Sequence, residues 1–301
     1  MSDGQSIVSA DELMEAMKSP RTVVFDTRFS LTDLEYGDRV YAAGHLPGAL
    51  YLHLDRDLSS EVTQNTGRHP LPDIEKFAQR MRECGVSIDT QVVAYDDAAG
   101  MFASRLWWLL KYLGHDRVAV LDGGLPAWRA AGGAEEVTIP QLPALGNFQA
   151  RRRPEMFVDV QQVQQGLTDG SLQLFDARAP ERYRGDVEPI DKVAGHVPGA
   201  INVPFSQNLD ASGCFQPAEE LARLHARSAK ETLKDSRDNS VSSRMRMVHM
   251  CGSGVTACHN ILASAVAGLP LPALYAGSWS EWIVDPQRPV ATGEPKTDRN
   301  C

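Results

Sequence analysis

An internal duplication constrains the fold of this 301-residue chain more than any other feature of its sequence. Three motifs occur twice and in the same order: an apolar run ending in Asp-x-Arg, a Gly-His-x-Pro-Gly-Ala motif, and a glycine-containing segment that closes with Trp. They lie at residues 23–28 and 172–178, 44–49 and 195–200, and 121–128 and 275–282. Because the period is about half the chain, the sequence predicts a duplicated domain rather than a solenoid of short repeats.

Short apolar runs alternate with helical stretches in each copy. Helices are predicted at 102–113 and 256–267. Continuous apolar strands separated by helices are typical of parallel sheets covered on both faces. We therefore expect an α/β fold, each copy with a central, mostly parallel β-sheet flanked by helices on both faces. The strands are predicted at 22–26, 50–54, 91–95 and 118–121 in the first copy, and at 172–176, 200–203, 245–250 and 273–275 in the second.

The segment between the two copies is rich in proline, which favours a connector over a packed element. We expect an N-terminal domain over residues 1–137, a linker over 138–154 and a C-terminal domain over 155–301. A polar, serine-rich stretch at 234–243 predicts a surface insertion inside the second domain.

Charge and composition narrow the class of partner. The net charge of −9 argues against nucleic acid or an anionic membrane surface. The first residues hold neither a basic nor an apolar run, and Pro270 and Pro272 interrupt the longest apolar stretch, so we expect neither a secretory leader nor a membrane span. The five cysteines are scattered and lack zinc-ligand spacing. We expect no metal, no cofactor and a reducing, cytoplasmic location.

The sequence Cys-Gly-Ser-Gly-Val-Thr-Ala at 251–257 connects a predicted strand to a predicted helix. Gly252 and Gly254 permit positive φ, which lets successive backbone N–H groups converge above the Cys251 sulfur. The helix that begins near Thr256 adds the positive end of its dipole. These donors favour an anion at the sulfur, at the sheet edge where α/β proteins place active sites. We predict a nucleophilic thiolate, with a buried structural cysteine as the alternative.

The other cysteines have no such context. Cys258 falls just inside the predicted helix, on its apolar face, and is interpreted as structural. No feature around Cys84, Cys214 or Cys301 indicates a function.

Residues 251–257 resemble the active-site loop of the rhodanese superfamily, and the Gly-Ser pair after the cysteine resembles its 3-mercaptopyruvate sulfurtransferase branch. With the three repeated motifs, the resemblance to tandem rhodanese proteins covers essentially the whole chain. It implies two rhodanese-like domains, the first inactive and the second catalytic. It also implies a sulfurtransferase that moves a sulfane sulfur from 3-mercaptopyruvate, through a Cys251 persulfide, to a thiophilic acceptor. Cyanide, a thiol or a protein cysteine can serve as acceptor, with a thioredoxin-like protein as a candidate reductant.

The first copy differs from the second where the nucleophile would stand. Asp96 follows the strand that corresponds to the one before Cys251, and a carboxylate cannot accept a sulfane sulfur. We therefore expect the first domain to be catalytically silent. His45 and His196 occur in both copies although only one copy has a nucleophile, so we interpret each as a structural imidazole that bonds a backbone group at a turn.

The resemblance also implies which residues assist the cysteine. Ser253 matches a serine that acts with a histidine and an acid, which His69 and Asp55 match. The structural alternatives are that His69 caps a loop and that Asp55 begins a turn. Arg182 matches an arginine that binds the anionic end of the donor, and an exposed surface arginine is the alternative. The loop residues implied to bind substrate are Gly252, Gly254, Val255 and Thr256.

One position departs from the family pattern. Many mercaptopyruvate enzymes carry a second arginine nine residues after the first, whereas this chain has Asp191 there, within the short loop 187–195. Arg184 and Lys192 are candidate replacements for the missing charge.

Three rival functions remain to be weighed. Thiosulfate is the alternative donor, but thiosulfate-type loops carry basic residues after the cysteine, whereas Gly252 and Ser253 are neutral. A cysteine phosphatase needs an arginine six positions after the nucleophile, and Ala257 occupies that position. A non-catalytic module that senses sulfur or binds a partner would have no need of an intact Cys251 loop.

Overall fold

The computed structural model describes residues 4–233 and 245–294, so the predicted insertion at 234–243 and Cys301 lie outside the described residues. The chain divides into two compact units, each built mainly from one half of the sequence. The first unit comprises Met1–Glu61, Leu71–Pro154 and Leu209–Gln216, and the second comprises Val62–Pro70, Glu155–Asn208 and Pro217–Cys301. Each half therefore contributes one short segment to the unit that the other half builds.

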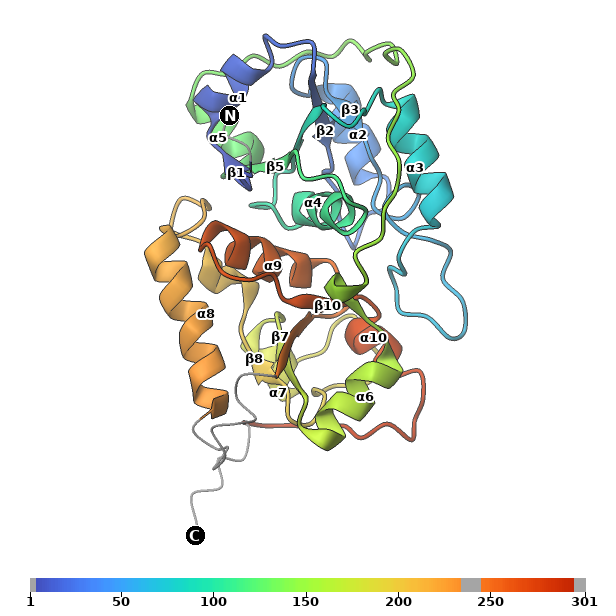
Figure 1. Cartoon of the computed structure of the whole chain (residues 1–301), viewed down its shortest axis with the longest axis vertical. Coiled ribbons are helices and arrows are strands. Elements are labelled where there is room, and N and C mark those ends of the chain that lie inside the picture. Colours follow the sequence, from blue (N-terminus) through green and yellow to red (C-terminus); the bar gives the residue numbers. More distant parts are fainter. Residues whose placement is uncertain (1–3, 234–244, 295–301) are drawn as a thin grey trace. The chain divides into compact units, whose positions relative to one another are not determined.

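The first unit has a five-stranded sheet in the order β1-β5-β4-β2-β3, and all of its strand pairs are parallel (Figure 1). Its strands are β1 (Ile7–Val8), β2 (Thr22–Asp26), β3 (Leu50–Tyr51), β4 (Gln91–Tyr95) and β5 (Val118–Leu121). Its helices are α1 (Ala10–Ala16), α2 (Tyr36–Ala43), α3 (Ile74–Glu83), α4 (Ala103–Tyr112) and α5 (Gly124–Ala130).

The second unit repeats this topology in the order β6-β10-β9-β7-β8, again with parallel pairs. Its strands are β6 (Phe157–Val158), β7 (Leu172–Asp176), β8 (Ile201–Asn202), β9 (Arg246–Met250) and β10 (Ala273–Tyr275). Its helices are α6 (Val160–Asp169), α7 (Pro180–Arg184), α8 (Ala218–Leu233), α9 (Thr256–Val266) and α10 (Ser278–Trp282), with 3-10 turns at Pro154–Met156 and Phe205–Asn208. Among the described residues, no helix combines the length and apolar character that crossing a membrane requires.

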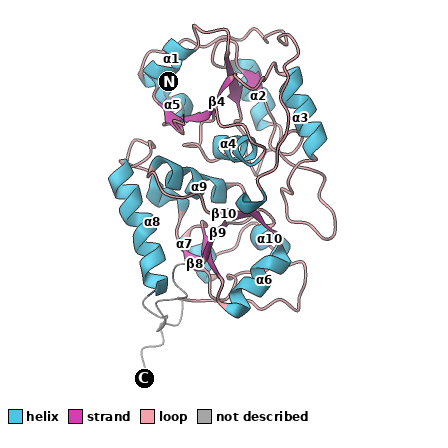
Figure 2. Ribbon diagram, in the orientation of Figure 1, coloured by secondary structure: helices cyan, strands magenta, loops and turns pink. Residues whose placement is uncertain are grey.

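The strands of the second unit bury both of their faces, because successive side chains point to opposite sides of a sheet. Val248 and Met250 of β9 pack in one core cluster with Trp279 and Trp282 of α10. His249, between them in sequence, points the other way and lies near His225 of α8. Helices flank the strands of each unit in Figure 2. The predicted α/β fold with parallel sheets covered by helices is confirmed.

The strand predictions fail mainly at the sheet edges. The strands expected at 50–54 and 200–203 are only two residues long, and β1 and β6, also two residues each, were not predicted. A two-residue strand is too short to show any periodicity, and parallel pairing with a central neighbour decides its conformation instead. Central strands, by contrast, are longer and mostly apolar.

The repeated motifs form the same ion pair and the same histidine–backbone contact near the strand ends of both units. Nη2 of Arg28 lies 2.6 Å from Oδ2 of Asp26, and Nη2 of Arg178 lies 2.7 Å from Oδ2 of Asp176. The Nδ1 atoms of His45 and His196 lie 2.8 Å from the carbonyl oxygens of Tyr41 and Tyr183, respectively. The structural interpretation of both histidines is confirmed, since each imidazole bonds a backbone carbonyl at the turn.

Candidate active site

Cys251 follows the last residue of β9 and is only 2% exposed. The Gly254 N–H donates to its Sγ at 3.2 Å. The Cys251 N–H donates to Ser278 Oγ at 3.1 Å, and the Cys251 carbonyl accepts from the Trp279 N–H at 3.0 Å. The backbone of the loop is therefore fixed to the start of α10 while the sulfur receives an amide.

The two glycines of the loop serve different purposes. Gly254 has φ of +78°, and a Cβ there would collide with the carbonyl oxygen of Ala276. The prediction of a positive φ at Gly252 is wrong, because its φ lies outside the left-handed region. A Cβ on Gly252 would instead lie 2.8 Å from Nη2 of Arg68, so this position is small to admit a guanidinium. The close approach of the Arg68 guanidinium, and not the backbone conformation, favours a small residue there.

Val255 and Thr256 complete the loop at the start of a helix. Val255 is the residue before α9 and is buried, and Thr256 is the first residue of α9. Helix N-termini favour negative charge, which supports the electrostatic interpretation of this loop. Cys258, one turn later, donates its thiol to the Gly254 carbonyl at 3.3 Å and is fully buried.

Ser253 and His69 meet in the second unit, although 184 positions separate them in sequence. Nδ1 of His69 lies 2.7 Å from Oγ of Ser253, and both residues are 5% exposed. A hydroxyl and an imidazole at this distance can exchange a proton in either direction, depending on the tautomer. The structure thus brings together the serine and histidine that the sequence suggested.

Asp55 lies in the first unit, in the turn after β3, and is half-buried. Its N–H donates to Nδ1 of His53 at 3.1 Å. The pairing of Asp55 with His69 stays a prediction.

Arg182 lies on α7, with its guanidinium beside the cysteine loop. Its Nη1 and Nη2 atoms are 3.6 and 3.7 Å from the position that a Cβ on Gly252 would occupy. Nη2 is also 2.7 Å from Oε1 of Glu188 and 3.1 Å from Oδ2 of Asp191. The predicted donor-binding cation is therefore next to the loop, but it is paired with two carboxylates rather than exposed to solvent.

The candidate replacements for the second arginine lie elsewhere. Arg184 forms ion pairs with Asp186 at 2.7 Å and with Glu294 at 3.5 Å. Lys192 is exposed.

Arg68 and Glu188 were missed by the sequence analysis. Arg68 forms an ion pair with Asp191, and its N–H donates to Ser280 Oγ at 3.0 Å. Burial lowers the pKa of Arg68 from its usual value, and the nearby Arg182 acts in the same direction. Glu188 accepts from Arg182 and lies 3.4 Å from Nη1 of Arg178. The sequence did offer one indication that Arg68 belongs to the site, because Arg68 directly precedes His69, which was already a predicted catalytic residue.

Ser278 was missed as well. It has φ of +56°, which is unusual for a residue other than glycine, and its Oγ donates to the Tyr275 carbonyl while accepting from Cys251. The corresponding position of the first copy is Gly124, with φ of +57°. A serine in place of a repeated glycine could have drawn attention to this position. Backbone strain of this kind is concentrated at functional sites.

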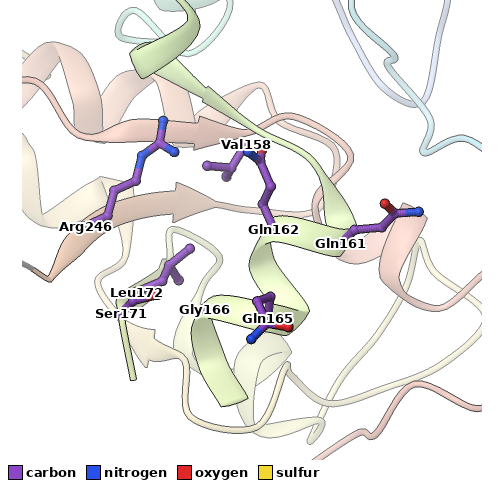
Figure 3. Close-up of a pocket in the computed structure, with 8 residues that line it drawn as sticks. All are labelled: Val158, Gln161, Gln162, Gln165, Gly166, Ser171, Leu172 and Arg246. Carbon is purple, nitrogen blue, oxygen red and sulfur yellow. The ribbon is translucent and has the colours of Figure 1, made fainter. Parts of the chain in front are cut away.

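A pocket of the second unit opens at the amino-terminal end of the strands, opposite to the end that Cys251 follows (Figure 3). It is lined by Leu172 and Arg246, the first residues of β7 and β9, and by glutamines of α6. The Arg246 Nη2 atom donates to the carbonyls of Glu155 at 2.6 Å and Phe157 at 3.1 Å. Because Cys251 follows the opposite end of β9, this pocket is no part of the candidate active site.

Comparison with known proteins agrees with this geometry. The rhodanese-like domain family matches residues 9–131 and again 159–285. The chain is 47% identical to a probable 3-mercaptopyruvate sulfurtransferase of Pseudomonas aeruginosa, over 98% of this chain and 100% of that protein. It is 40% identical to SseB of Mycobacterium tuberculosis, provisionally named a thiosulfate sulfurtransferase, over 96% of this chain and 98% of that protein.

The fold is similar to a solved structure, the 3-mercaptopyruvate sulfurtransferase SseA of Escherichia coli. The TM-score is 0.76 and the identity 32%, over 92% of this chain and 99% of that chain. Two matched domains, relatives aligned over nearly the whole sequence, and a cysteine loop at the end of a central strand lead to one conclusion: the chain belongs to the rhodanese family.

Proposed function

We propose that this protein is a sulfurtransferase that takes a sulfur atom from 3-mercaptopyruvate and passes it to a thiophilic acceptor through a persulfide on Cys251. The observation that carries the proposal is the Ser253–His69 pair beside the amide-bound sulfur. The cysteine nucleophile does not distinguish between donors, because it is common to the family. A proton relay beside it favours mercaptopyruvate, whose leaving group, the enolate of pyruvate, must be protonated. The name of the Pseudomonas aeruginosa relative supports the same donor.

In the first half-reaction, the Cys251 thiolate attacks the sulfur of the donor. A sulfur–sulfur bond forms, the sulfur–carbon bond of the donor breaks, and its electron pair leaves on the enolate of pyruvate. One proton then converts the enolate to pyruvate, and the enzyme holds a hydropersulfide. No external oxidant or reductant is required, because the cysteine sulfur and the donor sulfur are each oxidised by one electron while the donor carbon is reduced by two.

We assign Ser253 to supply the proton. Its hydroxyl can donate to the enolate while His69, 2.7 Å away, returns a proton to the oxygen. We assign Asp55 to orient the imidazole, as an acid does in other three-group relays.

In the second half-reaction, an acceptor attacks the outer sulfur and the Cys251 thiolate leaves. The Gly254 N–H and the start of α9 at Thr256 stabilise this thiolate and the persulfide anion alike, because both place negative charge at the same loop. Cyanide, small thiols and protein cysteines are suitable acceptors. We propose a thioredoxin-like protein as the reductant, and the cytoplasm as the compartment where such a reductant keeps thiols reduced.

Thiosulfate is the second candidate donor, favoured by the name of the Mycobacterium tuberculosis relative. Its leaving group, sulfite, needs no proton on carbon, so the Ser253–His69 relay would be superfluous. We therefore expect Ser253→Ala and His69→Gln to lower kcat with mercaptopyruvate by roughly 100-fold and with thiosulfate by much less. Equal losses with both donors would argue for a structural role of the pair.

The decisive test is the mass of the intact protein after incubation with 3-mercaptopyruvate. We expect wild type to gain one sulfur atom, and Cys251→Ser to gain none and to lose at least about 1,000-fold in turnover. Cys258→Ser is the matched control, since its thiol is buried in the same helix-loop segment and should leave the gain intact. The proposed function fails if wild type gains no sulfur, or if Cys251→Ser gains as much.

A further inference from the structure

One carboxylate bridges two guanidinium groups at the cysteine loop. Asp191 pairs with Arg68 through Oδ1 and with Arg182 through Oδ2, and its side chain is only 4% exposed. Both arginines border Gly252: Arg68 Nη2 lies 2.8 Å, and Arg182 Nη1 3.6 Å, from the position of a Cβ there. The two cations and the carboxylate that joins them therefore adjoin the residue directly after the nucleophile.

The formal charges of this cluster balance. Arg182 is also bound by Glu188, whose side chain is 2% exposed and which reaches Arg178 as well. Arg178 already pairs with the buried Asp176. Three arginines thus meet three carboxylates, and no cation of the cluster is left without a carboxylate partner.

Several contacts hold Arg68 in position beside the cysteine loop. Its backbone is held by Ser280 Oγ, its guanidinium is largely buried, and Gly252 is small enough to admit it. A buried guanidinium loses hydration, so it binds an oxyanion strongly when one replaces water. Arg68, from the first half of the sequence, therefore pairs with Asp191, the residue at the position where many mercaptopyruvate enzymes carry their second arginine.

We propose that Arg68 is the second donor-binding cation and that Asp191 sets the charge of the donor that the site accepts. This inference rests on the proposed sulfurtransferase function. Asp191 and Glu188 offset the charges of Arg68 and Arg182 beside the loop, so the N–H donors of the two guanidinium groups can bind the single carboxylate of a 2-oxo acid without a large excess of positive charge. A dianion such as thiosulfate would place its additional charge against Asp191, and like charges in a site with little water repel strongly.

The test compares two donors in matched variants, with cyanide as the common acceptor. Asp191→Asn keeps the size of the side chain and removes its charge. We expect the ratio of kcat/KM for thiosulfate to kcat/KM for mercaptopyruvate to rise at least about tenfold, mainly through a lower KM for thiosulfate. Asp186→Asn removes a charge from the same surface region, where Asp186 pairs with the outward Arg184, and should leave the ratio unchanged.

Arg68 is tested by its own pair of variants. Arg68→Met should raise the KM for mercaptopyruvate at least about tenfold with a smaller change in kcat, and Arg68→Lys should recover part of that loss. Equal KM values for wild type and Arg68→Met would overturn the assignment of Arg68.

A measurement on wild type guards against a variant that fails to fold. Pyruvate and sulfate each compete with iodoacetamide for the site, and protection of Cys251 from alkylation is read by mass. We expect pyruvate, a monoanion, to protect at a concentration at least about tenfold lower than sulfate, a dianion. Better protection by sulfate, or an unchanged donor ratio in a folded Asp191→Asn protein, would overturn the inference while wild type still gains sulfur from mercaptopyruvate. Wild type that gains no sulfur would instead overturn the proposed function, and this inference with it.

Discussion

The loop after β4 and the loop after β9 bind different groups at the same place in the fold. In the first unit, the Asp96 carboxylate accepts four backbone N–H groups, at 2.7 to 2.9 Å, and is fully buried. Burial raises the pKa of Asp96, whereas the four amides act to lower it. In the second unit, the corresponding place belongs to Cys251, whose sulfur receives the Gly254 N–H. The donors of the Asp96 loop are Ala98, Gly100, Phe102 and Ala103.

This difference supports the proposal that the first copy is catalytically silent. A ring of amides at the end of a central strand selects negative charge, whatever group carries it. Asp96 fills that ring permanently with its own side chain. In the proposed mechanism Cys251 carries negative charge only as the thiolate and the persulfide anion, so its loop can pass through a catalytic cycle.

Removing the Asp96 carboxylate should have the largest effect on stability. Asp96→Ala leaves four buried N–H groups without their acceptor, and we expect it to lower the free energy of unfolding of the first unit by about 4 kcal/mol. Urea denaturation measures this change. Cys251→Ala is the matched variant, expected to cost no more than about 1 kcal/mol because sulfur is a weak acceptor. Equal losses at the two loops would contradict the comparison.

The second effect concerns the buried histidines behind the Cys251 loop. His249 of β9, where β4 has Ala94, lies with its ring centroid 6.1 Å from that of His225, and Nε2 of His225 lies 3.1 Å from Oδ1 of Asn208. Burial lowers the pKa of His225 from 6.5 to about 4, and burial together with His225 lowers the pKa of His249.

An unfolded histidine binds a proton below about pH 6.5, whereas folded His225 binds one only near pH 4. Protonation therefore favours the unfolded chain, and stability falls as the pH drops from 6.5 towards 4. Between pH 7.5 and 5, His225 alone should account for a loss of about 2 kcal/mol. Urea unfolding at the two pH values measures the loss, and His225→Gln should reduce it. The same pH dependence in the variant would exclude His225 as a cause.

The smallest effect on stability is expected at Ser278, where both copies have a left-handed backbone conformation but only the second copy has a side chain. Ser278→Gly converts the residue to the glycine of the first copy and relieves about 1 kcal/mol of left-handed strain. It also removes the acceptor of the Cys251 N–H, which is worth about 1 kcal/mol. We expect stability to change by less than about 0.5 kcal/mol while turnover falls several-fold because the loop is held less firmly. A stability change above about 2 kcal/mol, with normal turnover, would show that Ser278 serves the fold alone.

The parallel sheets could be predicted from sequence because their central strands are mostly apolar runs. The strands at 22–26, 91–95, 118–121 and 172–176 were placed without error for the same reason. The nucleophile loop could be found because its glycines and its position between a strand and a helix are local features. The contact between Gly252 and Arg68 could not be predicted, because the two residues are far apart in the sequence.

Charge pairing was equally hidden. Asp191 looked like the loss of a cation when only its own neighbourhood was considered, yet its partner Arg68 stands 123 positions earlier. Nothing in a single sequence specifies such a pair, because tertiary packing alone decides which distant side chains meet. Ser278 was overlooked for another reason: a positive φ at serine contradicts the residue's ordinary preference.

The nine residues Val62–Pro70 belong to the unit that the other half of the chain builds, and they carry both His69 and Arg68. A gene fragment that starts at residue 155 would encode the nucleophile without the imidazole next to Ser253. If the proposed relay operates, recombination at the boundary of the repeat would release a second copy without His69, which could not act as a freestanding mercaptopyruvate enzyme. The segment Val62–Pro70 then ties the second copy to the first half of the chain in every functional gene.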